Sequence, residues 1–283
     1  MASDSISSLE RLAPNMRYTI EIIRPAELLD PLRKGLLDNL NYLINDAYVV
    51  HGHPRHNEER DSFYTSDRIS SEDQLILELG PNGLLAICTD GTLSNALPVS
   101  NSRRVFGEPY HPGKYGKLVA TASLKPWKGK IVDVFQQAQQ VLDKHGTTQG
   151  AHSNLPLSDL ELSKVTSEIL GSGIDNRTGT WNWEVAACAS VNDTRYRGQG
   201  LMIQCLDALV AKLVAQRSAS REAGQPRGDV RIKLWSSALV GSGNIEYWTR
   251  RGFVKEGEAD VAPKGLWTAT RDFKIQTLSK VVE

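Results

Sequence analysis

Cysteine is scarce in this sequence, and nothing in its placement suggests a sulfur-based scaffold. The three cysteines, Cys88, Cys188 and Cys205, lie in apolar segments and form no CxxC pair or Cys/His spacing typical of zinc ligands. We therefore expect reduced thiols rather than disulfides, and a cytoplasmic location is the simpler interpretation.

An excess of charge of either sign is also missing, as are long apolar runs. Thirty-three basic residues balance thirty-three acidic ones, so no global field attracts the chain to nucleic acid or to an anionic membrane. No stretch of about 18 apolar residues is present, and the first fifteen residues lack a charged segment followed by an apolar one. We expect neither nucleic-acid nor membrane partners, and the oligomeric state stays open.

Apolar residues make up 40% of the 283 residues, enough for a substantial core. We expect a flexible tail over 1–16 and a single domain over 17–283, with a helical insertion over 126–180 between the third and fourth strands. The pattern of elements predicts an α/β or α+β fold around one sheet. Strands are expected at about 18–24, 84–90, 117–124, 181–191, 229–237 and 266–278, and helices at 31–48, 71–79, 131–145, 158–170, from Gly200 onward and before Gly252.

Three histidines, His51, His53 and His56, fall within six residues of a polar loop. Such a cluster can ligate a metal, or it can consist of solvated loop histidines. No further group of ligands is visible, so we expect no metal site.

A glycine-containing stretch, "TRYRGQGLM" at 194–202, separates a predicted strand from a predicted helix. The first N–H groups of that helix have no intrahelical partner, and that end carries a partial positive charge. Gly198 and Gly200 remove side chains that would hold a phosphate away, and Arg195 and Arg197 add charge suited to phosphate oxygens. The stretch is thus a candidate diphosphate site, although a plain strand-to-helix turn also needs glycine.

Other phosphate-binding and nucleophile motifs are missing. A dinucleotide fingerprint needs a third glycine where Ile203 stands, and no Gly-Lys-Ser/Thr follows any glycine-rich loop. There is likewise no GxSxG of a serine hydrolase. These absences leave Arg-x-x-Gly-x-Gly, after a buried strand and opening a helix, as the pattern to explain.

In these residues the sequence resembles the GNAT superfamily of acyl-CoA-dependent N-acyltransferases. The resemblance depends on "SVNDTRYRGQGLM", on "RPAE" after the first strand and on "YWTRRGF" at 247–253. It implies a GNAT-like fold, whose mixed central sheet is splayed between strands four and five, and acetyl-CoA as the cofactor. It also implies that the amides of 197–201 hold the coenzyme A diphosphate and that the backbone of 189–191 pairs with the pantetheine arm. The cofactor-binding residues expected on this basis are Ala189, Ser190, Val191, Arg195, Tyr196, Arg197, Gly198, Gln199, Gly200, Leu201, Asn244 and Trp248.

A base is expected, because an alkyl amine with a pKa near 10.4 is protonated at pH 7 and its deprotonation costs roughly 4.6 kcal/mol. Glu184 shares a strand face with Ala186 and Cys188 if the strand is regular, and burial there would raise its pKa toward neutrality. In histone-acetylating members of the family a catalytic glutamate occupies a similar position, which implies the same role for Glu184. The alternative is a structural carboxylate paired with an arginine.

Departure of the coenzyme thiolate is usually assisted in this family by a tyrosine four residues before the late Gly-Phe. Here that position is Trp248, so either the neighbouring Tyr247 serves as the acid or the thiolate leaves to water. The two aromatic residues could instead only pack under the cofactor. Cys188 and Cys205 are interpreted as core thiols, with an acyl-cysteine role as the alternative.

The function predicted from these features is transfer of an acetyl group to a primary amine of a small molecule, by direct attack in a ternary complex. The insertion and the long first helix could wall such a pocket. Three alternatives stay open: a protein or histone lysine acetyltransferase, a non-catalytic acyl-CoA-binding module, and an enzyme of this fold with a reaction independent of coenzyme A.

Overall fold

The structure is a computed structural model that describes residues 17–50, 69, 74–93, 114–144, 174–175, 180–222, 231–269 and 271–282. The expected tail over 1–16, the histidine loop and the helix expected at 158–170 lie outside the described residues. Among the described residues, no three His, Cys, Asp or Glu side chains form a group that could hold a metal. No helix in the described ranges is long and apolar enough to cross a membrane.

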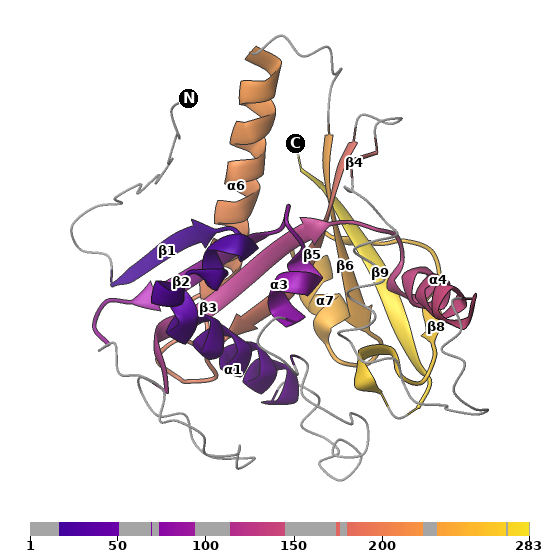
Figure 1. Cartoon of the computed structure of the whole chain (residues 1–283), viewed down its shortest axis with the longest axis horizontal. Helices are drawn as coiled ribbons and strands as arrows, with labels where there is room; N and C mark the ends of the chain where they lie inside the picture. Colours follow the sequence, from indigo (N-terminus) through magenta and orange to yellow (C-terminus); the bar gives the residue numbers. More distant parts are fainter. Residues whose placement is uncertain are drawn as a thin grey trace.

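One mixed sheet runs through the molecule in the order β1-β2-β3-β5-β6-β9-β7 (Figure 1). Two short strands lie off this path, β4 against β5 and β8 against β9. The strands are β1 (Tyr18–Ile23), β2 (Leu84–Asp90), β3 (Lys114–Pro126), β4 (Ile174–Asp175), β5 (Thr180–Ser190), β6 (Arg231–Leu239), β7 (Val254–Lys255), β8 (Asp260–Ala262) and β9 (Phe273–Val282). The expected antiparallel pairing of 84–90 with 117–124 is confirmed.

The sheet divides between β5 and β6, its parallel pair. These strands are paired from Thr180 and Arg231 as far as Glu184 and Trp235. Beyond that point β5 pairs with β3 alone, and β6 pairs with β9 alone. A mixed sheet splayed between the fourth and fifth expected strands is therefore present.

A bulge interrupts β5 just past the point of divergence. Thr121 and Ser123 of β3 face Ala189 and Ala186, so two steps on β3 match three on β5. The extra residue brings Ala187 to a φ of 42°, in the left-handed region that non-glycine residues rarely adopt. The bulge reverses which face the following side chains occupy.

Helices cover both faces of the sheet. On one face α1 (Lys34–Val50) packs over β3 and β5, and α3 (Gln74–Leu79) packs over β3; on the opposite face α6 (Leu201–Glu222) crosses β1, β2, β3 and β5 (Figure 1). The shorter α7 (Asn244–Thr249) contacts β6 and β9, and α4 (Ile131–Lys144) lies beside β8. Three 3-10 turns complete the described elements: η1 (Pro25–Leu29), η2 (Pro31–Arg33) and η3 (Leu266–Thr268).

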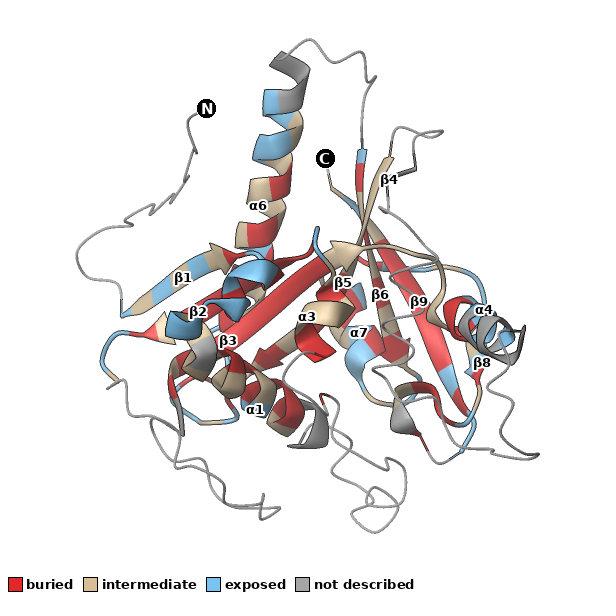
Figure 2. Cartoon of the chain, in the orientation of Figure 1, coloured by how far each residue is buried: buried red, intermediate tan, exposed pale blue. Residues whose placement is uncertain are grey.

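The core has two unequal parts. The larger one joins the helices α1, α3, α6 and α7 to the sheet, and a smaller one joins α4 to β8, η3 and β9 around Phe135, Leu266 and Ile275. Buried residues are concentrated on β2, β3 and β9 (Figure 2). The helix expected at 131–145 therefore belongs to the second core.

Two expected boundaries are corrected. Leu32 was expected on the apolar face of the first helix, but Pro31–Arg33 forms a 3-10 turn before α1 and leaves Leu32 94% exposed. The last strand was expected over 266–278, but it begins at Phe273. Residues 266–268 form η3 instead, after Gly265 with a φ of 95°.

Candidate functional site

The glycine loop lies between the end of β5 and the start of α6, where Asp193 organises a turn. The Asp193 carbonyl accepts hydrogen bonds from the amides of Tyr196 and Arg197, at 3.0 and 2.9 Å. Its carboxylate accepts the amide of Arg195 at 2.8 Å. This is the side-chain-to-backbone pattern that makes aspartate favourable in turns.

Several amides of this loop have no acceptor in the described part of the chain. They belong to Gly198, Gly200, Leu201, Met202 and Ile203, and the first intrahelical bond starts only at the amide of Gln204. Gly198 and Gly200 have φ values of 74° and 66°, and a Cβ on either would meet no atom within 4 Å. N–H groups that have no acceptor among the described residues, beside open space at the start of a 22-residue helix, make this loop a candidate anion site.

The amide of Arg197, expected to bind the diphosphate, is already bonded to Asp193, and that of Gln199 makes a long 3.4 Å contact to Tyr196. Within the expected cradle of 197–201, the amides of Gly198, Gly200 and Leu201 thus have no acceptor among the described residues.

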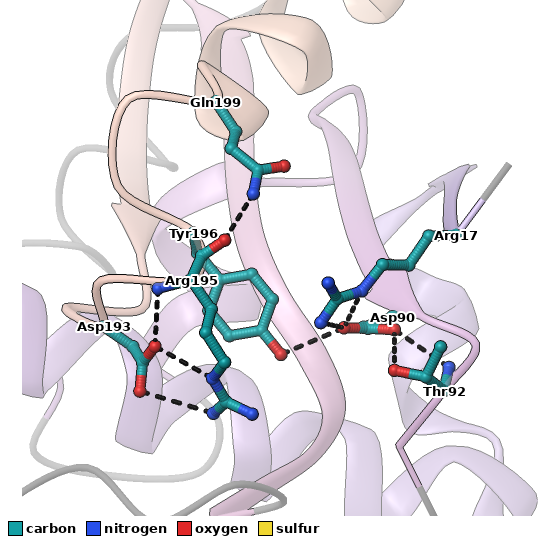
Figure 3. A network of polar contacts seen from close by, with 7 residues as sticks. All are labelled: Arg17, Asp90, Thr92, Asp193, Arg195, Tyr196 and Gln199. Carbon is teal, nitrogen blue, oxygen red and sulfur yellow. Dashed lines mark hydrogen bonds and ion pairs between the residues drawn. The ribbon is translucent and has the colours of Figure 1, made fainter.

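The loop alternates between outward and inward side chains. Arg195 and Arg197 are exposed and pair locally, with Asp193 and with the Asn192 side chain. Tyr196, between them, is 4% exposed and donates its hydroxyl to Asp90 Oδ2 at 3.0 Å (Figure 3). The two guanidinium groups thus lie beside the free amides, whereas the Tyr196 side chain, expected to bind the cofactor, faces the core.

Asp90, at the end of β2, is fully buried. Oδ2 also accepts Nε of Arg17 at 2.8 Å, and Oδ1 accepts the amide and hydroxyl of Thr92 at 2.9 and 2.6 Å (Figure 3). Burial by itself would raise the pKa of Asp90, but hydrogen bonds from Arg17, Thr92 and Tyr196 outweigh it and hold that pKa well below its usual range. The carboxylate therefore stays charged at neutral pH.

The gap between β5 and β6 exposes strand edges. Val191 donates its amide to Val119 on β3 at 2.9 Å, so the N–H and C=O of the preceding Ser190 point the other way, to the side from which β6 has diverged. On β6, the Ser237 hydroxyl is buried and has no hydrogen-bond partner in the described structure. Ser237 lies two residues beyond Trp235, past the last β5–β6 pair. The edge of β5 that faces the gap therefore presents backbone groups of Ser190 for which the described chain supplies no acceptor or donor.

Glu184 stands at the last paired position before the gap, and its nearest charged partner is Lys125. The Lys125 ammonium lies 3.5 Å from Glu184 and 3.6 Å from Glu78 of α3. The three side chains are 10–15% exposed. An ion pair with a lysine is thus present at Glu184, where the structural alternative named an arginine, and the cluster faces the side of the sheet covered by α1 and α3. The ammonium stabilises an ionised carboxylate, the form required of a base.

Cys188 does not share the face of Glu184, contrary to expectation, because the bulge at Ala187 reverses the alternation. Cys188 influences the pKa values of Cys205 on α6 and of Tyr247 on α7, which marks it as their neighbour. Burial raises the pKa of the Cys188 thiol to about 12. A thiol so rarely ionised is a poor nucleophile, which favours the expected core role over an acyl-cysteine.

The aromatic pair of α7 divides into one buried and one accessible residue. Trp248 is 8% exposed and packs against Phe253 at 5.1 Å between ring centroids. Tyr247 is half-buried, and its ring is covered by the Arg251 guanidinium at 3.5 Å. Burial raises the pKa of the Tyr247 phenol, opposed by Arg251. Asn244, at the start of α7, is exposed.

Asp90, Lys125 and Ser237 did not stand out in the sequence. Asp90 is a charge ending an otherwise apolar strand, and Ser237 is a hydroxyl within an alternating one. Those irregularities were the available signals. The hydrogen-bond and ion-pair partners of Asp90 and Lys125 lie up to 106 residues away in sequence.

Comparisons by sequence find no matching family model and no matching curated protein.

Comparison by structure finds 61 matching chains. One is FeeM, an N-acyl amino acid synthase from uncultured soil microbes, with 10% identity, a TM-score of 0.43, and 93% of this chain and 90% of that chain covered. Another is Arabidopsis thaliana NAA60 with a bisubstrate analogue, with 11% identity, a TM-score of 0.42 and coverage of 94% and 100%. A third is BjaI, a CoA-dependent acyl-homoserine lactone synthase, with 13% identity, a TM-score of 0.43 and coverage of 94% and 84%. Similarity this distant leaves function to be inferred from the chain's own site.

Proposed function

We propose that this chain is an acyl-CoA-dependent N-acyltransferase of the GNAT type, which transfers an acetyl group from acetyl-CoA to a primary amine of a small molecule. One observation carries the proposal. Backbone amides that have no acceptor in the described chain open α6, in the loop that follows β5, the strand that parts from β6 beyond Glu184. The amides at the start of α6 suit an anion, and the gap between β5 and β6 suits an extended chain. Together they suit a ligand that has a diphosphate at one end and an extended arm at the other.

The residues present fit coenzyme A. The amides of Gly198, Gly200 and Leu201 would hold the diphosphate, with the Arg195 and Arg197 side chains released from their local partners to neutralise it. The outward backbone groups of Ser190 would bind the amide-containing arm as a strand binds its neighbour. Acetyl-CoA supplies an acyl thioester that an amine can attack.

Acid and base would act from opposite faces of the gap. Glu184, beside Lys125 on the face of α1 and α3, would take a proton from the amine. Tyr247, beside Cys188 on the other face, would supply a proton to the departing sulfur. The raised pKa of Tyr247 keeps its phenol protonated at neutral pH, as a donor must be.

A small-molecule acceptor is supported by the cover that α1 and α3 give to the face of Glu184. A protein lysine is the alternative within the same chemistry, with the same Glu184 in support. A cytoplasmic location fits the three free thiols.

A second candidate function is a non-catalytic acyl-CoA-binding module. It is favoured by Trp248, which stands at the usual tyrosine position and is packed in the core. A panel of amines with acetyl-CoA, followed by free-thiol detection, separates the two: release of coenzyme A above the amine-free rate supports the transferase. A labelled lysate analysed by mass spectrometry then distinguishes small from protein acceptors.

The proposal is tested by calorimetric titration of acetyl-CoA. We expect Gly200→Asp to weaken binding at least about 100-fold, because its carboxylate occupies the anion site and repels phosphate. Gly257→Asp is the matched control, since Gly257 has a φ of 70° and equally open space at its Cβ. Equal affinity of wild type and Gly200→Asp, or no binding to either, would overturn the proposal.

A further inference from the structure

The side chains of the loop from 192 to 200 differ in where they bond. Arg195, Arg197 and Gln199 bond to the loop itself. Tyr196 reaches a residue 106 positions earlier, across to the end of β2 (Figure 3). Its phenol therefore ties the loop to the sheet.

Asp90 is built to hold that phenol in one place. Both oxygens are engaged, with Arg17 and Tyr196 on Oδ2 and Thr92 on Oδ1. The Arg17 carbonyl also accepts the amide of Gly91, which fixes the start of β1 against the turn after β2. Hydrogen bonds to an ionised acceptor are shorter and stronger than neutral ones. A buried carboxylate with this many donors has little freedom to move.

Rings reinforce the contact. Tyr18 and Tyr196 meet edge to face with centroids 6.3 Å apart, and the Arg17 guanidinium lies 5.4 Å and 5.6 Å from their centroids. The Tyr196 ring is thus enclosed by β1 and β2, which α6 also crosses. The amides that follow Tyr196 start from a fixed point.

We infer that Asp90 is a positioning residue of the anion loop, acting through the Tyr196 hydroxyl to hold the amides of Gly198, Gly200 and Leu201 in their binding arrangement. This inference rests on the proposed function and names the residue that prepares its binding step. A loop held in place before binding avoids the entropy cost of ordering when the ligand arrives. The contribution therefore falls on affinity for the anion and not on the chemical step.

The test compares Tyr196→Phe with Thr92→Val. Each removes one hydroxyl bonded to Asp90, but only Tyr196 belongs to the loop. For Tyr196→Phe we expect a Kd for acetyl-CoA raised about 5–20-fold. We expect its kcat at saturating acetyl-CoA to stay within twofold, and amide hydrogen exchange over 197–203 to be several-fold faster without ligand. For Thr92→Val we expect all three quantities within twofold of wild type.

Two outcomes overturn the inference. One is unchanged affinity and exchange in Tyr196→Phe; the other is an equal loss in Thr92→Val, which would mean that the cluster only supports the fold. If wild-type protein binds no acetyl-CoA, the proposed function fails, but the exchange comparison still decides whether Asp90 holds the loop.

Discussion

Two polar clusters, one around Asp90 at the end of β2 and one around Lys125 on β3, differ in the length of their contacts and in burial. Around Asp90 the contacts are 2.6–3.0 Å and the carboxylate is fully buried. Around Lys125 the two ion pairs are 3.5 and 3.6 Å long, and all three side chains keep some access to solvent. The first cluster holds backbone in place, whereas the second leaves charged groups able to rearrange when a substrate enters. Under the proposed function, the fixed region would serve binding and the adjustable region would serve the chemistry.

The strongest test of the adjustable region is Glu184→Gln. Loss of the base should lower kcat roughly 100-fold with KM for acetyl-CoA within twofold. Glu78→Gln removes the other carboxylate that pairs with Lys125, and it should lower kcat less than about fivefold. Steady-state kinetics of both variants decide the role: equal losses would reduce Glu184 to a structural partner of Lys125.

The fixed region around Asp90 is tested by comparing the thermal stability of Asp90→Asn with that of wild type as pH changes. The folded pKa lies well below the usual range, whereas an unfolded aspartate titrates near about 3.9. As pH falls, the unfolded chain takes up the proton first, so the stability contributed by Asp90 is full above about pH 5, starts to fall near about pH 4, and declines further until pH reaches the folded pKa. We expect Asn to lower Tm by roughly 4–8 °C at pH 7.

Melting curves from pH 7 to pH 3 measure this difference, which should shrink toward acid. Glu21→Gln, in the exposed Arg33 pair of the same sheet, is the control. A gap between wild type and Asp90→Asn that stays constant with pH would contradict a charged Asp90.

Tyr247→Phe addresses the opposite face of the gap. Removal of the proposed acid should lower kcat about 3–10-fold, while the ring and its Arg251 contact are retained. The drop should be larger for acetyl-CoA than for an activated aryl thioester, whose thiolate leaves without help. The same drop for both thioesters would argue that the phenol only packs.

The smallest effect is expected at Cys188. With a pKa of about 12, its thiolate at pH 8 is roughly 1,000-fold rarer than that of a free cysteine. Cys188→Ala should therefore keep kcat within twofold, and iodoacetamide should label wild-type Cys188 slowly. Mass spectrometry that found an acetylated Cys188 during turnover would reverse this interpretation.

Local pattern was sufficient for most of the elements. The apolar run of 84–90 predicted β2 to the residue, and helical periodicity over 31–48 predicted α1 to within three residues at either end. It failed where one residue changes the geometry. Pro31 starts a 3-10 turn, and the bulge at Ala187 moves Cys188 to the other face.

The order of strand, glycine loop and helix from β5 to α6 was also predictable, because these elements are contiguous in sequence. Partners distant in sequence were not. Nothing near Asp90 indicates Tyr196, and nothing near Glu184 indicates Lys125, since strand pairing brings these residues together. A single sequence contains the residues of such a pair but not their proximity.

The bulge in β5 also has a genetic consequence. Losing the codon for Ala187 would restore strict alternation, and the side chains of Cys188, Ala189 and Ser190 would each move to the opposite face of the sheet. Such an in-frame deletion removes no functional group, yet it would turn the free peptide edge at Ser190 inward. A one-residue change of register in β5 should therefore disturb the structure more than most amino-acid replacements in this strand.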